Sequence, residues 1–102
     1  MPTGIDKSDW DIVHQMACDV ANAAIMKDDV LMASKNAAML DLLSTLRAKY
    51  GEHPSILATI GDYLDDPAER RTMYLMALSI AKDRANQQEV AEITDSLKSL
   101  DE

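Results

Sequence analysis

Residues 54–81 read PSILATIGDYLDDPAERRTMYLMALSIA. The stretch divides at Asp66-Pro67, where an acidic side chain can accept hydrogen bonds from free backbone N–H groups and proline suits the first position of a helix. Apolar residues recur every three or four positions on both sides of this break, which is the period of a helix with one buried face. The stretch therefore predicts two consecutive helices that form a hairpin.

The composition of the whole chain predicts an all-α protein. Its 102 residues include three glycines, three prolines and no phenylalanine, while helix-forming residues dominate. A chain of this length can bury a core without disulfides or metal. We therefore expect a single domain over residues 1–102.

The same sequence indicates a cytoplasmic protein. Cys18 is the one cysteine, so no intramolecular disulfide forms, as is typical of a reducing compartment. No stretch approaches the roughly 18 apolar residues of a membrane span. Residues 1–8 show no cationic head followed by an apolar core, so no secretory signal is visible.

Charge is distributed unevenly along the chain. The net charge is −8; residues 1–51 carry seven acids and five bases, whereas residues 52–102 carry eleven acids and five bases. A field of this sign repels phosphate backbones and anionic lipid, which disfavours nucleic acid and membranes as partners. Two interpretations stay open: the charge keeps the protein soluble, or it forms an acidic surface for a basic partner.

Start and stop signals predict five antiparallel helices. Ser8 with Asp11 forms an N-cap pattern behind a flexible lead of residues 1–7, Gly51 ends the second helix, and Asn86 ends the fourth. The predicted helices span residues 9–26, 30–50, 54–64, 67–85 and 87–100. They group into a first hairpin over 8–51, a second over 52–86 and a C-terminal capping helix over 87–100. A five-helix bundle is the alternative.

Individual side chains within these helices also carry predictions. Gly61 lies on the buried stripe of its helix, so another helix could approach closely there. Arg70 is expected to face solvent as a partner of Glu69 or Asp66. Methionines at helical spacing are expected in the core, namely Met16, Met32, Met39, Met73 and Met76.

An internal repeat is weakly visible. A shift of 37 residues places Asp28-Asp29 on Asp65-Asp66 and produces eight identities. The length is that of a helix–turn–helix unit.

The run Tyr74-x-x-Ala77-Leu78-x-x-Ala81, behind a helix that carries Leu57-Ala58, resembles a tetratricopeptide repeat, best over residues 54–97. The resemblance implies that Tyr74 and Ala77 let the two helices nest, with Leu57-Ala58 as their first-helix counterparts. It also implies two hairpins stacked in a right-handed superhelix. Two positions depart from the family: Arg70 stands where a small residue is usual, and Gly61 where an aromatic is preferred.

The resemblance further implies a concave groove lined by the first helix of each hairpin. The groove would expose Glu52, Ser55, Thr59, Asp62, Tyr63, Glu89, Glu92 and Ser96. This polar, mostly acidic set is the predicted partner-binding site, and Tyr63 would supply the aromatic contact area that interfaces favour. An ordinary solvated face is the alternative.

The sequence offers little for catalysis. His14 and His53 are 39 positions apart, and no Cys–His or His–Glu pair is expected to bind a metal. Asp28-Asp29 and Asp65-Asp66 each precede a helix, so capping accounts for them. We expect no enzymatic activity, cofactor or metal.

These observations favour a non-enzymatic interaction module whose acidic surface binds a basic peptide or protein. A small acidic protein of this build also resembles a bacterial immunity protein or a secretion chaperone. The alternative is a structural homodimer, or a fragment of a larger helical-repeat array.

Overall fold

The computed structural model describes residues 5–101, and over this range it contains five helices and no strand. The helices are α1 (Lys7–Ile25), α2 (Asp29–Tyr50), α3 (Pro54–Tyr63), α4 (Pro67–Asp83) and α5 (Gln87–Asp101). The predicted all-α fold is therefore confirmed. Contacts divide the chain into two compact units, Met1–Lys49 and Tyr50–Glu102.

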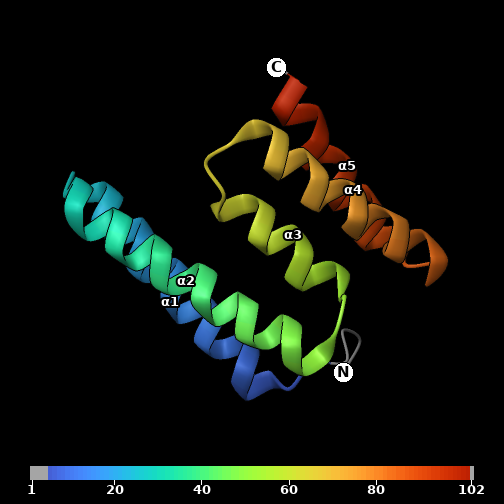
Figure 1. Ribbon diagram of the computed structural model, residues 1–102, viewed down its shortest axis with the longest axis horizontal. Coiled ribbons are helices and arrows are strands. Elements are labelled where there is room, and N and C mark those ends of the chain that lie inside the picture. Colours follow the sequence, from blue (N-terminus) through green and yellow to red (C-terminus); the bar gives the residue numbers. More distant parts are fainter. Residues whose placement is uncertain (1–4, 102) are drawn as a thin grey trace. The chain divides into compact units, whose positions relative to one another are not determined.

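The first unit is an antiparallel pair of helices, α1 and α2 (Figure 1). Lys49 Nζ lies 2.8 Å from Asp9 Oδ2, so an ion pair joins the last turn of α2 to the first turn of α1. The buried apolar side chains of these helices are Val13, Ala23, Met39, Leu43 and Leu46. Met32 is exposed, so its predicted place in the core is wrong.

The start of α1 differs from the prediction. The helix begins at Lys7, and Asp6 occupies the N-cap position without a side-chain capping bond. Ser8 therefore lies inside the helix, and its predicted N-cap role is wrong. An ion pair of 2.8 Å between Lys7 and Asp11, one turn apart, supports this earlier start. Of the predicted flexible lead, residues 1–4 lie outside the described range, and Ile5 is buried.

The turn between α1 and α2 is a Schellman motif. Lys27 adopts a left-handed conformation with φ 55°, and the N–H groups of Lys27 and Asp28 donate to the carbonyls of Ala24 and Ala23 at 3.1 Å. Asp28 Oδ1 then accepts from the Leu31 N–H at 3.0 Å and caps α2. The predicted capping role is confirmed for Asp28, whereas Asp29 is the first residue of α2.

In the second unit, α4 packs against both α3 and α5, and α3 also contacts α5 (Figure 1). The core of this unit is formed by Leu57, Tyr74, Ala77, Ala81 and Ile93, all buried. Leu57, Tyr74 and Ala77 therefore meet between α3 and α4, as the sequence predicted. Partly buried apolar residues of α4 and α5 pack around this core.

The helix ends of the second unit follow local side-chain chemistry. Buried His53 caps α3, because its Nδ1 accepts from the Ser55 N–H at 3.1 Å. Asp66 Oδ1 accepts from the Ala68 N–H at 3.2 Å and caps α4. Asn86 does not end α4 as predicted; α4 ends at Asp83, and Asn86 Oδ1 instead accepts from the Glu89 N–H at 3.2 Å to cap α5.

Candidate functional site

The predicted groove residues come together mainly where α3 contacts α5. Ser55 Oγ on α3 donates to Glu89 Oε1 on α5 at 3.4 Å. Thr59 Oγ1, one turn further along α3, donates to the Ser55 carbonyl at 2.6 Å. Ser55, Thr59 and Glu89 are all half-buried. The Ser55 and Glu89 side chains are thus joined, and Thr59 is bonded to the Ser55 backbone; we call these three residues the Ser55–Glu89 cluster.

The carboxylate of Glu89 is held on one side only. Asn86 Nδ2 donates to Glu89 Oε1 at 3.0 Å, so this oxygen accepts from both Asn86 and Ser55. Glu89 Oε2 is buried and has no hydrogen-bond partner. Buried polar atoms in folded proteins nearly always have a partner. Glu89 Oε2 is therefore an exception to this rule.

Asp62 is tied to α4 instead. The Tyr74 hydroxyl donates to Asp62 Oδ1 at 2.5 Å, and Arg70 Nη2 donates to the Tyr74 hydroxyl at 3.4 Å. Arg70 Nε also donates to the Gly61 carbonyl at 3.0 Å, which satisfies a carbonyl in the last turn of α3. Arg70 is half-buried, so the prediction that it faces solvent beside Glu69 or Asp66 is wrong.

Burial has the largest effect on the pKa values of Asp62 and Tyr74. Burial raises the pKa of Asp62 above its ordinary value of 3.8, although the Tyr74 hydrogen bond and the Arg70 charge lower it. Burial also raises the pKa of Tyr74 above its ordinary value of 10.0, and the hydrogen bond to Asp62 adds to this rise. The network suits a structural contact between α3 and α4 better than a site that must stay open to a ligand.

The remaining predicted site residues are dispersed. Glu52 is exposed in the loop before α3, and Tyr63 is half-buried at the end of α3. Glu92 is exposed on α5, and the half-buried Ser96 donates to the Glu92 carbonyl at 3.2 Å. Asn86 was missed by the sequence interpretation. The pattern Asn86-x-x-Glu89 is that of a capping box, so this signal was present in the sequence.

Charge in the second unit is segregated by helix. Helix α3 contains Asp62 and no Lys or Arg. Helix α5 contains Glu89, Glu92, Asp95 and Asp101, with Lys98 as its single base in the last turn. The bases of this unit are otherwise on α4 or at its end, namely Arg70, Arg71, Lys82 and Arg84. The α3–α5 pair is therefore acidic, whereas the α4 helix between them in sequence is not.

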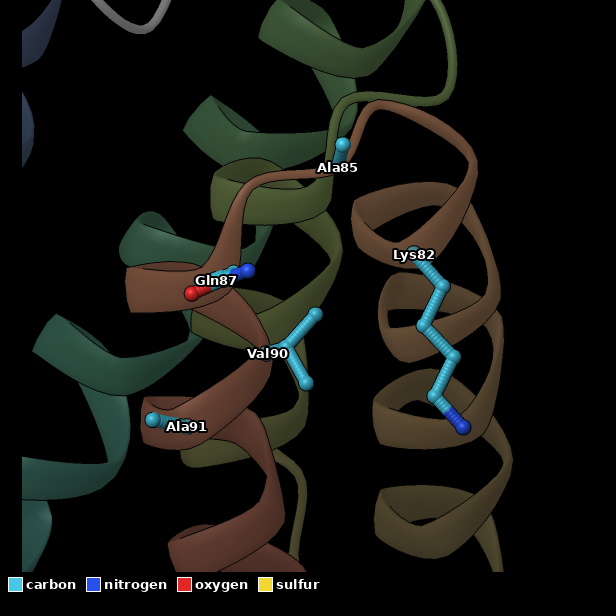
Figure 2. Close-up of a pocket in the computed structure, with 5 residues that line it drawn as sticks. All are labelled: Lys82, Ala85, Gln87, Val90 and Ala91. Carbon is cyan, nitrogen blue, oxygen red and sulfur yellow. The ribbon is translucent and has the colours of Figure 1, made fainter.

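A separate open hollow of about 370 Å³ lies between α4 and α5. Figure 2 shows Lys82 on α4 and Val90 on α5 on opposite sides of it; Ala85, Gln87 and Ala91 complete the lining. None of the predicted site residues contributes to it. Its lining supplies one ammonium and one amide but no carboxylate, thiol or imidazole, so it is not a convincing catalytic site.

Within residues 5–101, no cluster of three or more His, Cys, Asp and Glu side chains could hold a metal ion. His14 and Cys18 lie one turn apart at exposed positions of α1, a ligand spacing that the sequence interpretation overlooked. Trp10 contacts the His14 ring edge-to-face at a centroid distance of 5.9 Å. Two ligands alone do not complete a tetrahedral site.

None of the helices in the described part of the chain combines the length and the apolar character needed to cross a membrane. Comparison of the chain with protein-family models, with curated proteins and with solved structures gives no match. The tetratricopeptide-like relationship therefore stays a prediction that depends on the residues of α3, α4 and α5.

Proposed function

We propose that this protein is a non-enzymatic interaction module whose α3–α5 pair binds a basic peptide or protein. The observation that carries the proposal is the segregation of charge, because α3 and the first three turns of α5 contain carboxylates and no base. A surface of one sign increases the rate of encounter with a partner of the opposite sign and disfavours the wrong partners. The proposal includes two further points: the hairpins have a tetratricopeptide-like arrangement, and the protein acts in the cytoplasm.

Small size and a net charge of −8 are also consistent with two specific roles. An immunity protein that neutralises a basic toxin, or a chaperone for a basic secreted protein, needs rapid capture rather than chemistry. Electrostatic steering supplies that rate at physiological salt only when the charges are close to the interface, because the screening length there is about 8 Å. Both roles place the partner directly on the acidic α3–α5 pair.

The test is recovery of a partner from the source cell at increasing salt, with two variants that change the net charge equally. Glu92→Lys alters the exposed face of α5, whereas Asp83→Lys alters the exposed end of α4. We expect the wild type to recover a basic partner whose yield falls with salt, and we expect Glu92→Lys to reduce the yield more than Asp83→Lys. Equal losses would assign the effect to net charge alone.

A second candidate function is a structural homodimer or part of a larger helical array. It is favoured by large apolar side chains at the α1–α2 turn, where Ile25, Met26 and Val30 are 78%, 67% and 83% exposed. Contiguous exposed apolar side chains commonly mark interaction sites. Sedimentation at high salt separates the two candidates, because a dimer formed through apolar contacts persists there and an acidic interface with a basic partner does not.

A further inference from the structure

We propose that two copies of this protein associate through the free end of the α1–α2 hairpin, and that the dimer thereby presents two acidic surfaces to a basic partner. The bivalent part of this inference rests on the proposed function, whereas the dimer contact does not. We define the hairpin tip as residues 20–40, which contain the end of α1, the turn and the first half of α2 (Figure 1).

The hairpin tip leaves its large apolar side chains exposed to water. Ile25, Met26 and Val30 are about two thirds or more exposed, and Met32 is exposed as well. Between residues 20 and 38 only Ala23 is buried, because a pair of helices covers only the stripe along which they meet. Contiguous apolar side chains of this kind commonly mark a surface that another molecule covers.

Charge identifies that molecule as a second copy. The hairpin tip contains two acids, Asp28 and Asp29, and two bases, Lys27 and Lys35, so its net charge is zero. The charge of −8 therefore lies entirely on the rest of the chain. Two copies repel each other wherever those other residues approach, and they repel least where the two tips meet. A basic partner is instead attracted to the acidic residues and not to a neutral tip.

The charges beside the turn also complement those of a second copy. Lys27 and Asp29 are exposed, and within residues 5–101 neither side chain forms an ion pair or a hydrogen bond. In a two-fold dimer every contact occurs twice, so Lys27 of one copy meets Asp29 of the other and the reverse pair forms as well. Exposed pairs add little affinity, but they select the direction in which the two tips meet.

The size of the hairpin tip implies a weak dimer. Stable interfaces of standard size use about 20–30 residues from each partner, and the tip has 21 residues of which only a part is exposed. We therefore expect a concentration-dependent dimer with a dissociation constant on the order of 10 µM. Added salt should tighten it, because salt screens the repulsion between two chains of charge −8 and leaves the apolar contacts in place.

A dimer joined at the tips carries two copies of the acidic α3–α5 pair. The hairpin tip belongs to the unit Met1–Lys49, whereas α3 and α5 belong to the unit Tyr50–Glu102, so the two surfaces share no residue. The two candidate functions are then compatible. A ligand with two basic segments that span both surfaces is held twice, which raises its apparent affinity without any new contact.

Sedimentation equilibrium of the full chain over a concentration series tests the dimer. Ile25→Gln and Ile12→Gln make the same change on the same helix, and Ile12, which is 50% exposed and lies outside the tip, is the matched control. We expect Ile25→Gln to weaken dimerisation at least about tenfold, because each dimer contains the change twice, and Ile12→Gln to weaken it less than about twofold. A wild type that stays monomeric at about 1 mM, or equal losses in the two variants, overturns the tip contact.

A pair of charge variants tests the two-fold arrangement. Lys27→Asp makes the tip acidic and Asp29→Lys makes it basic, while Asp28 still caps α2 in both. We expect each variant alone to dimerise more weakly than the wild type, and an equimolar mixture to form the mixed dimer, in which both pairs are restored. A mixture that dimerises no better than the separate variants overturns the reciprocal pairing.

Binding of a blocked oligolysine peptide separates the dimer from the wider proposal. By calorimetry at low ionic strength, the free peptide should bind the wild type and Ile25→Gln equally. A sensor surface densely coated with the peptide should release the wild type about tenfold more slowly, because only a dimer engages two peptides. Equal release rates overturn the bivalent part alone. If the wild type binds no oligolysine, the acidic-surface proposal fails, while the dimer is still decided by sedimentation.

Discussion

At the scale of single residues, the Tyr74 side chain explains why Gly61 and Arg70 depart from the tetratricopeptide pattern. A Cβ atom at Gly61 would lie 2.7 Å from Tyr74 Cε1 and 3.0 Å from Cδ1, so the absence of a side chain there gives the ring its place. Arg70 donates to both the Gly61 carbonyl and the Tyr74 hydroxyl. The two unusual residues thus belong to one contact, in which α4 supplies the aromatic ring.

Gly61→Ala is expected to destabilise the protein by about 1 kcal/mol. Alanine gains about 1 kcal/mol of helix propensity over glycine, but overpacking of a filled core costs about 1–3 kcal/mol, and the neighbour here is a buried ring rather than a flexible chain end. Urea unfolding measures the change. Ser79→Ala on the exposed side of α4 is the control and should alter stability by less than about 0.5 kcal/mol. A Gly61→Ala protein as stable as the wild type would contradict the packing argument.

Tyr74→Phe should lower the free energy of unfolding at neutral pH by about 1 kcal/mol, because Asp62 loses a hydrogen-bond donor. The difference should shrink in alkaline solution. Since burial raises the pKa of Tyr74 in the folded protein, the unfolded chain loses this proton first as the pH rises above 10.0, and the wild type loses stability that Tyr74→Phe retains. Denaturant titrations below and above pH 10.0 check this. A constant difference across that range would show that the hydroxyl does not titrate as described.

The sequence predicted part of this contact. The resemblance to a tetratricopeptide repeat was sufficient to place Leu57, Tyr74 and Ala77 between two helices. The glycine on the buried stripe was sufficient to indicate a close approach at Gly61. They were not sufficient for the polar partners, because Arg70 and Asp62 are each joined to a residue on another helix. Those pairings depend on how the helices pack, which local pattern does not encode. The predicted groove was consequently only partly recovered, at the Ser55–Glu89 cluster.

At the scale of elements, two of the helix connections use the same device. At the end of α4, Ala85 has φ 54°, and the N–H groups of Ala85 and Asn86 donate at 3.0 Å to the carbonyls of Lys82 and Ala81. The α1–α2 turn has the same bonds around Lys27, and in both turns the following Asp28 or Asn86 caps the next helix. The predicted overlay of Asp28-Asp29 on Asp65-Asp66 therefore does not align equivalent turns.

Ala85→Gly is expected to raise the free energy of unfolding by about 1 kcal/mol, because a left-handed conformation costs a residue with a Cβ about that much and costs glycine almost nothing. Lys27→Gly should have the same sign for the same reason. Ala91→Gly, at an exposed position inside α5, is the control and should lower stability by about 1 kcal/mol. Thermal or urea unfolding measures the stability of the three variants. A loss of stability in all three would refute the idea that the left-handed conformation is costly at Ala85 and Lys27.

Some helix boundaries could be predicted from the local sequence pattern alone. Pro54 and Pro67 mark the starts of α3 and α4, and Gly51, with φ 81°, follows the end of α2, all as predicted. The start of α1 and the end of α4 were misplaced, because Ser8 and Asn86 are good capping residues wherever they occur. The left-handed Ala85 follows the end of α4, and one exposed ion pair, Lys7–Asp11, accompanies the earlier start of α1.

At the scale of the whole molecule, the charge of −8 is expected to act on stability and on binding with opposite signs. Like charges repel one another in the compact state, so screening by added salt should raise the thermal midpoint. The same screening should weaken capture of a basic partner. Parallel measurements of melting and of oligolysine affinity over one salt series check the pair of trends. A fall in both with salt would mean that attractive ion pairs, such as Lys49–Asp9, outweigh the repulsion.

The close approach at Gly61 has a consequence for how this chain can change over time. Because the Tyr74 ring occupies the space a Cβ would need, volume at positions 61 and 74 is shared rather than independent. Descendants that gain a methyl group at one position must give up ring atoms at the other. Sequences sharing this hairpin should therefore show compensating substitutions at the two sites, thirteen residues apart in the chain.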